Sequence, residues 1–211
     1  MKIKHILFCV AALSATFLSS ANGNSVSVTS EDEPRSDVRN TEFRPGELWK
    51  DTDGVAINAH GGGIMFHGGK YWWYGEYKTE GEAGNLAQVG VSCYSSTDLY
   101  NWKNEGIALA VSDEPGSDIE RGCILNVRRS SIMPLRGPWT ELGNPCEGEG
   151  SQLTFNSQST FILPVAGKAN TFIYMGDRWN PKNAIDGRYV WLPIEFDGDR
   201  FKIHWRDSWG F

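Results

Sequence analysis

Short apolar segments separated by turn residues run through most of the chain, and apolar residues do not recur at the 3.6-residue helical spacing beyond a turn or two. The pattern predicts two sets of short strands. The first set comprises residues 64–66, 70–75, 89–95 and 102–108, and the second comprises residues 159–164, 171–176, 188–194 and 200–205. Each set has the size and spacing of a four-stranded antiparallel blade, so the predicted fold class is all-β.

The stretch 56–76, AINAHGGGIMFHGGKYWWYGE, combines glycines, aromatics and polar residues in a predicted hairpin. Its glycine triplet lets the backbone approach a ligand or another strand closely. Asn58 and His60 precede the triplet. Trp73 lies in the aromatic second strand, and Glu76 ends that strand. Such a hairpin suits a sugar site, because pyranose rings stack on aromatics and a carboxylate can orient hydroxyls or move a proton. The alternative is that the aromatics pack within the sheet, His60 is structural and Glu76 is a solvated strand end.

The start of the chain has the pattern of a secretory signal: a basic beginning, an apolar run too short to span a bilayer, and small residues after it. Residues 1–21 are therefore expected to be a signal peptide, and the mature chain is expected to be secreted or periplasmic. Residues 22–44 are polar and lack an apolar period, which predicts a disordered linker. The folded domain is predicted at 45–211.

The formal charge of the chain is −6, and loss of Lys2 and Lys4 with the signal brings it to −8. This acidic balance argues against nucleic acid or an anionic membrane surface as a partner. No segment beyond the signal is long and apolar enough to cross a bilayer, so no membrane partner is expected after cleavage. Nine Trp, seven Tyr and ten Phe favour a polysaccharide or oligosaccharide partner. The pattern indicates no particular oligomeric state.

Three cysteines lie outside the predicted signal, namely Cys93, Cys123 and Cys146. An odd number allows at most one disulfide and leaves one free thiol, without fixing which pair forms. Their spacing is unlike that of a zinc site, so neither a metal nor another cofactor is predicted. Cys93 falls in a strand pattern and is expected to be a buried, small apolar residue.

The segments NAHGGG, WWYGE and CYSSTDLYNW, followed much later by TFNSQSTFILPV, FIYMGDRWNPKN and RYVWLP, carry a family resemblance. They resemble the first and last parts of the catalytic domain of glycoside hydrolase family 43, and in particular the branch that includes exo-β-1,3-galactanases. The matching stretches cover roughly residues 46–106 and 138–205. The resemblance implies a five-bladed β-propeller in which the first and last blades are neighbours in the ring.

The chain is too short for that whole fold, because five blades of roughly 45 residues need more than about 200 folded residues. Residues 117–125 resemble the start of the second blade, and residues 130–133 with residues 137–139 resemble the end of the fourth. The resemblance therefore implies an incomplete propeller, made of the first and last blades plus remnants, with a deletion seam near 126–136. An internal deletion, a mis-joined gene or a decayed gene would each produce such a seam, and a smaller intact fold is the alternative.

Glycosidases usually need two catalytic groups, which stand roughly 6.5–9.5 Å apart in inverting enzymes such as those of family 43. The resemblance maps Glu76 onto a glutamate that contacts substrate in the galactanase branch. It maps Gln158 onto a glutamine that this branch has where other members use an aspartate base. Both are candidate catalytic residues and are expected to face one central pocket. By residue type alone, Gln158 could hold a water molecule or could merely satisfy backbone groups at a strand end.

A general acid is not evident in the sequence, because the family's Arg-Glu-Ala-Pro-like motif does not occur. The carboxylates near the seam, none of them in a family-like setting, are Asp118, Glu120, Glu141, Glu147 and Glu149.

Asp177 and Trp179 follow a predicted strand and could line the pocket, the first binding sugar hydroxyls and the second stacking on a ring. With Asn58, His60 and Trp73 they form the predicted substrate-binding set. A structural ion pair between Asp177 and Arg178 is the alternative.

The sequence thus predicts a secreted glycoside hydrolase, exo-acting on β-1,3-galactan, in which truncation has removed the acid. A non-catalytic carbohydrate-binding remnant of such an enzyme is the alternative. An unrelated β-lectin fits less well, because Glu76 and Gln158 both fall in family-like settings.

Overall fold

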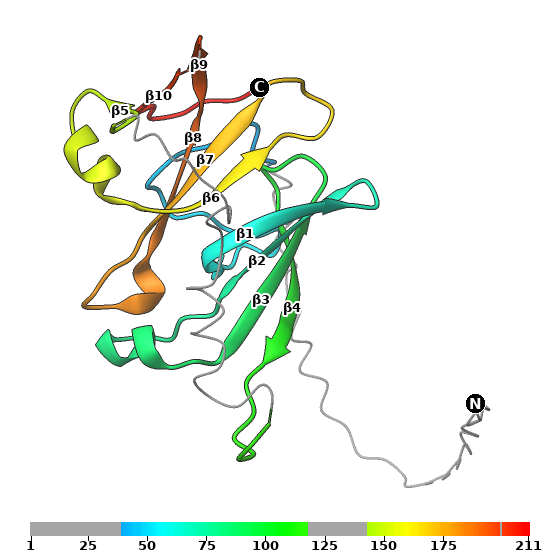
Figure 1. Cartoon of the computed structure of the whole chain (residues 1–211). Helices are drawn as coiled ribbons and strands as arrows, with labels where there is room; N and C mark the ends of the chain where they lie inside the picture. Colours follow the sequence, from blue (N-terminus) through cyan, green and yellow to red (C-terminus); the bar gives the residue numbers. More distant parts are fainter. Residues whose placement is uncertain (1–38, 118–142, 199) are drawn as a thin grey trace, which may run out of the picture. The chain divides into compact units, whose positions relative to one another are not determined.

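The computed structural model describes residues 39–117, 143–198 and 200–211 (Figure 1). This part of the chain is built of strands joined by turns and three short 3₁₀ helices, which confirms the all-β class. The strands are β1 (His60–His67), β2 (Lys70–Glu76), β3 (Gly90–Ser96), β4 (Lys103–Ala110), β5 (Cys146–Glu147), β6 (Gln158–Pro164), β7 (Phe172–Arg178), β8 (Arg188–Pro193), β9 (Glu195–Asp197) and β10 (Arg200–His204). The 3₁₀ helices are η1 (Glu82–Leu86), η2 (Ser151–Asn156) and η3 (Ala184–Asp186). The predicted signal, most of the predicted linker and the predicted seam lie outside the described residues.

The first predicted set of strands is confirmed, and it forms a four-stranded antiparallel sheet in the order β1-β2-β3-β4. Its first hairpin closes through Gly68 and Gly69, whose φ angles of 60° and 77° are those of the two-residue turns that suit tight hairpins. The strand ends His67 and Lys70 pair directly across this turn. The local sequence pattern therefore fixes the register of β1 on β2.

The second predicted blade is only partly correct, because its fourth strand joins another sheet. β6, β7 and β8 form a three-stranded antiparallel sheet. β10 pairs instead with β9 in a hairpin and with β5 in parallel, giving the order β5-β10-β9. Pro193 ends β8 and has no N–H for a further ladder bond, and the turn at Gly198 (φ 61°) directs the chain back onto β9.

One aromatic core joins the first sheet to the β6-β7-β8 sheet. The indole of Trp73 in β2 lies with its centroid 4.7 Å from that of Tyr189 and 4.8 Å from that of Trp191, both in β8. Trp102 closes the cluster 5.2 Å from Trp73. All four rings are almost fully buried. Large aromatic side chains give the greatest hydrophobic contribution per residue, so this cluster accounts for the packing of the two sheets on each other.

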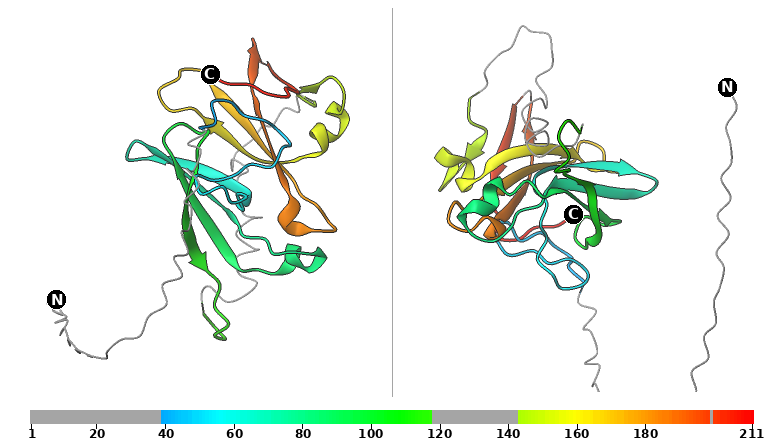
Figure 2. Two further views of the ribbon diagram at one scale, coloured as in Figure 1. Left: turned by 180° about the vertical axis from the view of Figure 1, so that it is seen from behind. Right: turned by 90° about the horizontal axis from the view of Figure 1, so that it is seen from below.

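The ordered packing begins before residue 45, inside the stretch predicted to be a linker. Phe43 is only 2% exposed and belongs to the aromatic core. Its N–H donates to the carbonyl of Trp209 at 2.7 Å, and the N–H of Trp209 donates back at 3.0 Å. The beginning of the described chain thus pairs with its end, as the blue and red segments in Figure 2 show. The aromatic side chain of Phe43 outweighs the polar composition of its neighbours.

A second, smaller core lies under β10 and contains Cys146 with Phe155, Tyr174, Val190, Leu192 and Ile203. Cys146 and Cys93 are both buried free thiols, which confirms the expectation for Cys93. Burial raises the pKa of each thiol, so both stay protonated and poorly reactive at neutral pH. Within the described ranges no group of His, Cys, Asp or Glu has the arrangement of a metal site. No helix of these ranges has the length and apolar character of a membrane span.

Alkaline pH is expected to unfold the protein through Tyr189. Burial, and secondarily the charge of Asp177, raise the pKa of this 3%-exposed tyrosine well above its ordinary value. The unfolded chain ionises near pH 10 while the folded chain keeps the proton, so stability is complete below about pH 10 and falls above it by up to about 1.4 kcal/mol per pH unit. The measurement is the urea midpoint between pH 8 and pH 11. Tyr189→Phe should flatten the loss, and an unchanged slope would contradict this assignment.

Candidate functional site

Four of the predicted site residues lie in a row at one end of the two main sheets. Glu76 and His60 are register partners in the β1–β2 hairpin, and Asp177 and Gln158 are register partners in the β6–β7 hairpin. β1 contacts both β6 and β7, so the row runs from Glu76 through His60 and Asp177 to Gln158. The expected proximity of the first and last parts of the chain is confirmed. That Glu76 and Gln158 face one pocket stays a prediction.

The glycine triplet before β1's apolar residues serves strand-to-strand contact. The register of β1 on β2 shifts between His60 and Gly63, which marks a bulge. A Cβ at Gly62 would lie 2.1 Å from the carbonyl oxygen of Tyr74, and the ring of Phe161 in β6 lies 3.4 Å from the Cβ position of Gly63. Of the two predicted uses of these glycines, close approach of another strand is the one found.

Glu76 is buried beside a lysine rather than solvated. Its side chain is 5% exposed, and its Oε1 lies 2.9 Å from the Nζ of Lys78, which is 7% exposed. A buried carboxylate needs a cation or several hydrogen bonds close by. The alternative of a solvated strand end is therefore wrong. The Glu76 side chain is buried against Lys78 at the end of β2.

Asn58 holds the backbone of Lys78. Its Oδ1 accepts the Lys78 N–H at 2.8 Å and its Nδ2 donates to the Lys78 carbonyl at 2.8 Å. The residue is 6% exposed, and its own N–H donates to the hydroxyl of Tyr94. This reciprocal bonding gives Asn58 a structural role, and its predicted substrate-binding role stays a prediction.

His60 and Asp177 tie the two sheets together. The Nδ1 of His60 lies 3.2 Å from Oδ1 of Asp177, and the N–H of Gly61 donates to Oδ2 at 2.7 Å. Both side chains are buried, and the His60 ring stacks on Tyr189 with centroids 5.3 Å apart. These contacts give both residues a structural role, and their predicted substrate-binding role stays a prediction. The alternative pair of Asp177 with Arg178 is wrong, because that guanidinium donates to the carbonyl of Phe155 at 2.6 Å.

The two predicted tryptophans have opposite environments. Trp73 is 1% exposed and surrounded by other aromatic rings, so its predicted role in stacking on a sugar is corrected to core packing. Trp179 is 54% exposed just after β7 and offers an open ring face at the same end as the row. Gln158 is exposed as well, at the first position of β6. Glu76, Gln158 and Trp179 are thus the members of the set whose environment still fits a ligand.

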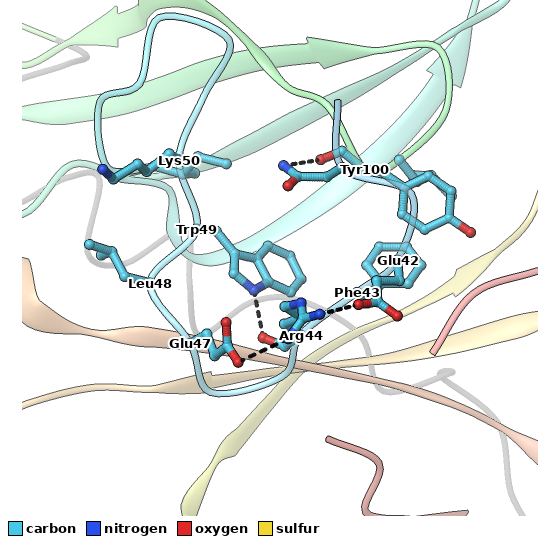
Figure 3. Close-up of a pocket in the computed structure, with 11 residues that line it drawn as sticks. Glu42, Phe43, Arg44, Glu47, Leu48, Trp49, Lys50 and Tyr100 are labelled. Atoms are coloured by element: carbon cyan, nitrogen blue, oxygen red, sulfur yellow. Dashed lines mark hydrogen bonds and ion pairs between the residues drawn. The ribbon is translucent and has the colours of Figure 1, made fainter. Parts of the chain in front are cut away.

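Two pockets among the described residues lie away from this row. One, of about 180 Å³, is lined by the N-terminal segment and by Leu99 and Tyr100 (Figure 3). Trp49 crosses it and donates through its indole N–H to the carbonyl of Arg44 at 2.8 Å. The other, of about 370 Å³, lies between β8 and the end of the chain. Neither of these two pockets contains a predicted site residue.

Comparison with known proteins identifies the architecture. No family profile matches the sequence, and no curated protein matches it. Among solved structures, a β-1,3-galactosidase of glycoside hydrolase family 43, BT3683, solved with galactodeoxynojirimycin, superposes over 80% of this chain and 100% of that chain, with a TM-score of 0.69 and 26% identity. The chain is structurally similar to glycoside hydrolases of family 43.

Two further structures of the family agree at lower identity. A second β-1,3-galactosidase, BT0265, superposes over 82% of this chain and 64% of its own, with a TM-score of 0.70 and 23% identity. The exo-β-1,3-galactanase of Phanerochaete chrysosporium with β-1,3-galactotriose superposes over 82% and 68%, with a TM-score of 0.63 and 18% identity. These two show the fold alone. The chain spans about two thirds of the length of these two relatives.

Of the five carboxylates near the predicted seam, two lie in described residues. Glu147 is in β5 and forms exposed ion pairs with Lys202 at 3.4 Å and with His204 at 3.8 Å. Glu149 is exposed in the following turn. Both have the environment of solvated surface groups, and neither adjoins the row of Glu76. Asp118, Glu120 and Glu141 lie outside the described residues.

Lys78, whose ammonium group forms an ion pair with Glu76, is not among the residues predicted from the sequence. A signal for it exists, since WWYGEYK places a cation two positions after the carboxylate. Alternation in an extended strand directs residues i and i+2 to one side, so the pair could have been inferred. The two hydrogen bonds between the Asn58 side chain and the Lys78 backbone have no such signal in the sequence, because these residues are 20 positions apart.

Proposed function

We propose that this chain is the galactose-recognising part of a secreted glycoside hydrolase that is exo-acting on β-1,3-galactan. In this proposal the described sheets are the first and last blades of an incomplete five-bladed propeller. The observation that carries it is the superposition on the whole of a family 43 β-1,3-galactosidase at 26% identity. The buried Glu76 at the sheet end and the exposed Gln158 and Trp179 beside it support a ligand at that end.

The chemistry of this sheet end fits a sugar. The carboxylate of Glu76 accepts hydrogen bonds only, as sugar hydroxyls require of an orienting group. The amide of Gln158 both donates and accepts, and Trp179 offers an apolar face for a pyranose ring. The acidic, aromatic-rich sequence with an expected signal peptide is consistent with an exported protein that acts on neutral polysaccharide.

A non-catalytic carbohydrate-binding remnant is the second candidate. It is favoured by one observation: the sequence has no Arg-Glu-Ala-Pro-like motif that could supply the acid. Both candidates require galactose recognition at this sheet end and differ only in turnover.

Titration of the full chain with β-1,3-galactotriose tests the shared step. We expect binding in about the millimolar range, because an incomplete propeller would cover little of the ligand. Glu76→Gln should abolish it, whereas Glu149→Gln, at an exposed carboxylate outside the row, should leave it unchanged. Calorimetry or ligand-observed NMR would report the affinity. Equal binding of galactotriose and of a glucose trisaccharide, or binding that survives Glu76→Gln, would refute the proposal.

A further inference from the structure

Burying the ion pair of Glu76 and Lys78 costs a large desolvation free energy. Both side chains are at least nine-tenths buried, and the Nζ–Oε1 distance is 2.9 Å. Removing two charges from water carries a large desolvation penalty, and well-packed apolar residues of similar volume are often as stabilising as a buried pair. Stability alone therefore explains poorly why charges occupy this place.

A matched pair in the same sheet shows the contrast. Lys103 and Glu105 in β4 have the same two-residue spacing and the same 2.9 Å distance, but the lysine side chain is 64% exposed. Exposed pairs of that kind contribute little and lose their geometry easily to water. The Glu76 pair has no such freedom, because protein surrounds it.

Lys78 is itself held from two directions. Its Nζ donates to the carbonyl of Asn85 in η1 at 3.2 Å. The Asn58 side chain forms hydrogen bonds with both the N–H and the carbonyl of its backbone. The Asn85 side chain donates in turn to the carbonyl of Asn180, the residue after the exposed Trp179. The ammonium group thus connects the carboxylate of Glu76 with the loop that presents Trp179.

We propose that Lys78 is a positioning residue that keeps the Glu76 carboxylate in one orientation for the hydroxyls of a terminal galactosyl group. The inference rests on the proposed function. Asn58 supports the arrangement by fixing the backbone of Lys78. A carboxylate held by a buried cation has a fixed orientation, which is what discrimination between sugar epimers requires.

The test compares full-length wild type, Lys78→Met and the matched exposed variant Lys103→Met, each titrated with β-1,3-galactotriose between pH 5 and pH 8. We expect Lys78→Met to weaken binding by about tenfold or more at pH 8, as loss of a charge-assisted contact does. A buried carboxylate without its cation takes up a proton readily. The affinity of Lys78→Met should therefore fall more steeply toward pH 5 than that of wild type or of Lys103→Met.

A second variant covers the case in which Lys78→Met fails to fold. The double variant Glu76→Gln/Lys78→Met has a neutral pair, and we expect it to fold and to lose galactotriose binding. Wild-type affinity with the pH profile of wild type in Lys78→Met would overturn the role of Lys78 while leaving the proposed function intact, whereas binding as tight as wild type by the double variant would overturn both. Absence of binding by wild type would overturn the proposed function and this inference with it.

Discussion

Galactose release from β-1,3-galactan by these 211 residues is expected to stay near the uncatalysed background. Hydrolysis of a glycoside in water is very slow, and positioned acid catalysis typically supplies about 10²–10⁴-fold of an enzyme's acceleration. The sequence lacks the family's acid motif, and the proposed incomplete propeller lacks the blades that would wall the pocket. Both losses act on the transition state, so turnover should suffer more than sugar binding. Chromatographic detection of released galactose measures the outcome.

A chimera supplies the matched comparison. Inserting the central segment of an intact relative near residues 126–136 should raise galactose release by about 10²-fold or more, because the acid and the missing walls return together. Glu76→Gln in that chimera should remove the activity again, whereas Glu149→Gln should preserve it. Robust turnover by the present chain would contradict both the missing acid and the incomplete propeller.

The fold was predictable where local pattern determines pairing. The β1–β2 hairpin follows from a two-glycine turn between apolar runs, and β3 and β4 follow as a meander from the same alternation. The place of β10 was not predictable in this way. Its apolar residues fit the second sheet as well as the third, and only the pairing of Ile203 with Cys146, far away in sequence, decides between them. Phe43 likewise enters the core through a bridge to Trp209 that no local pattern indicates.

The candidate site was predictable in position more than in role. Sequence placed Asn58, His60, Glu76 and Asp177 near one another, and the structure brings them to one end of the sheets. A polar residue in a strand sequence does not reveal whether its partner is a ligand or another strand. The sequence does not reveal the partners of Asn58 and His60, because Lys78 and Asp177 lie 20 and 117 residues away. Trp73 was misassigned for a related reason, since its covering rings come from β8 and from Trp102.

Gly75→Ala is expected to destabilise the protein by about 3 kcal/mol or more, which corresponds to a fall of roughly 10 °C in the thermal midpoint. A Cβ at Gly75 would lie 2.2 Å from the carbonyl carbon and 2.3 Å from the carbonyl oxygen of Ala59. That backbone cannot yield cheaply, because the N–H of Ala59 donates to the Tyr189 hydroxyl at 2.9 Å and its neighbour His60 contacts Asp177. A shift there would separate the first sheet from β7 and β8.

The matched control for Gly75→Ala is Gly167→Ala, at a turn glycine whose φ is +75° and whose Cβ position is open. It should cost only about 1–2 kcal/mol, because backbone strain acts there without a clash. Thermal unfolding of both variants measures the difference, and galactotriose binding reports on the adjacent Glu76. Because the clash lies one residue before Glu76, Gly75→Ala should also abolish binding, whereas Gly167→Ala should retain it. Equal midpoints for the two variants would show that the contact between β2 and Ala59 is looser than these distances require.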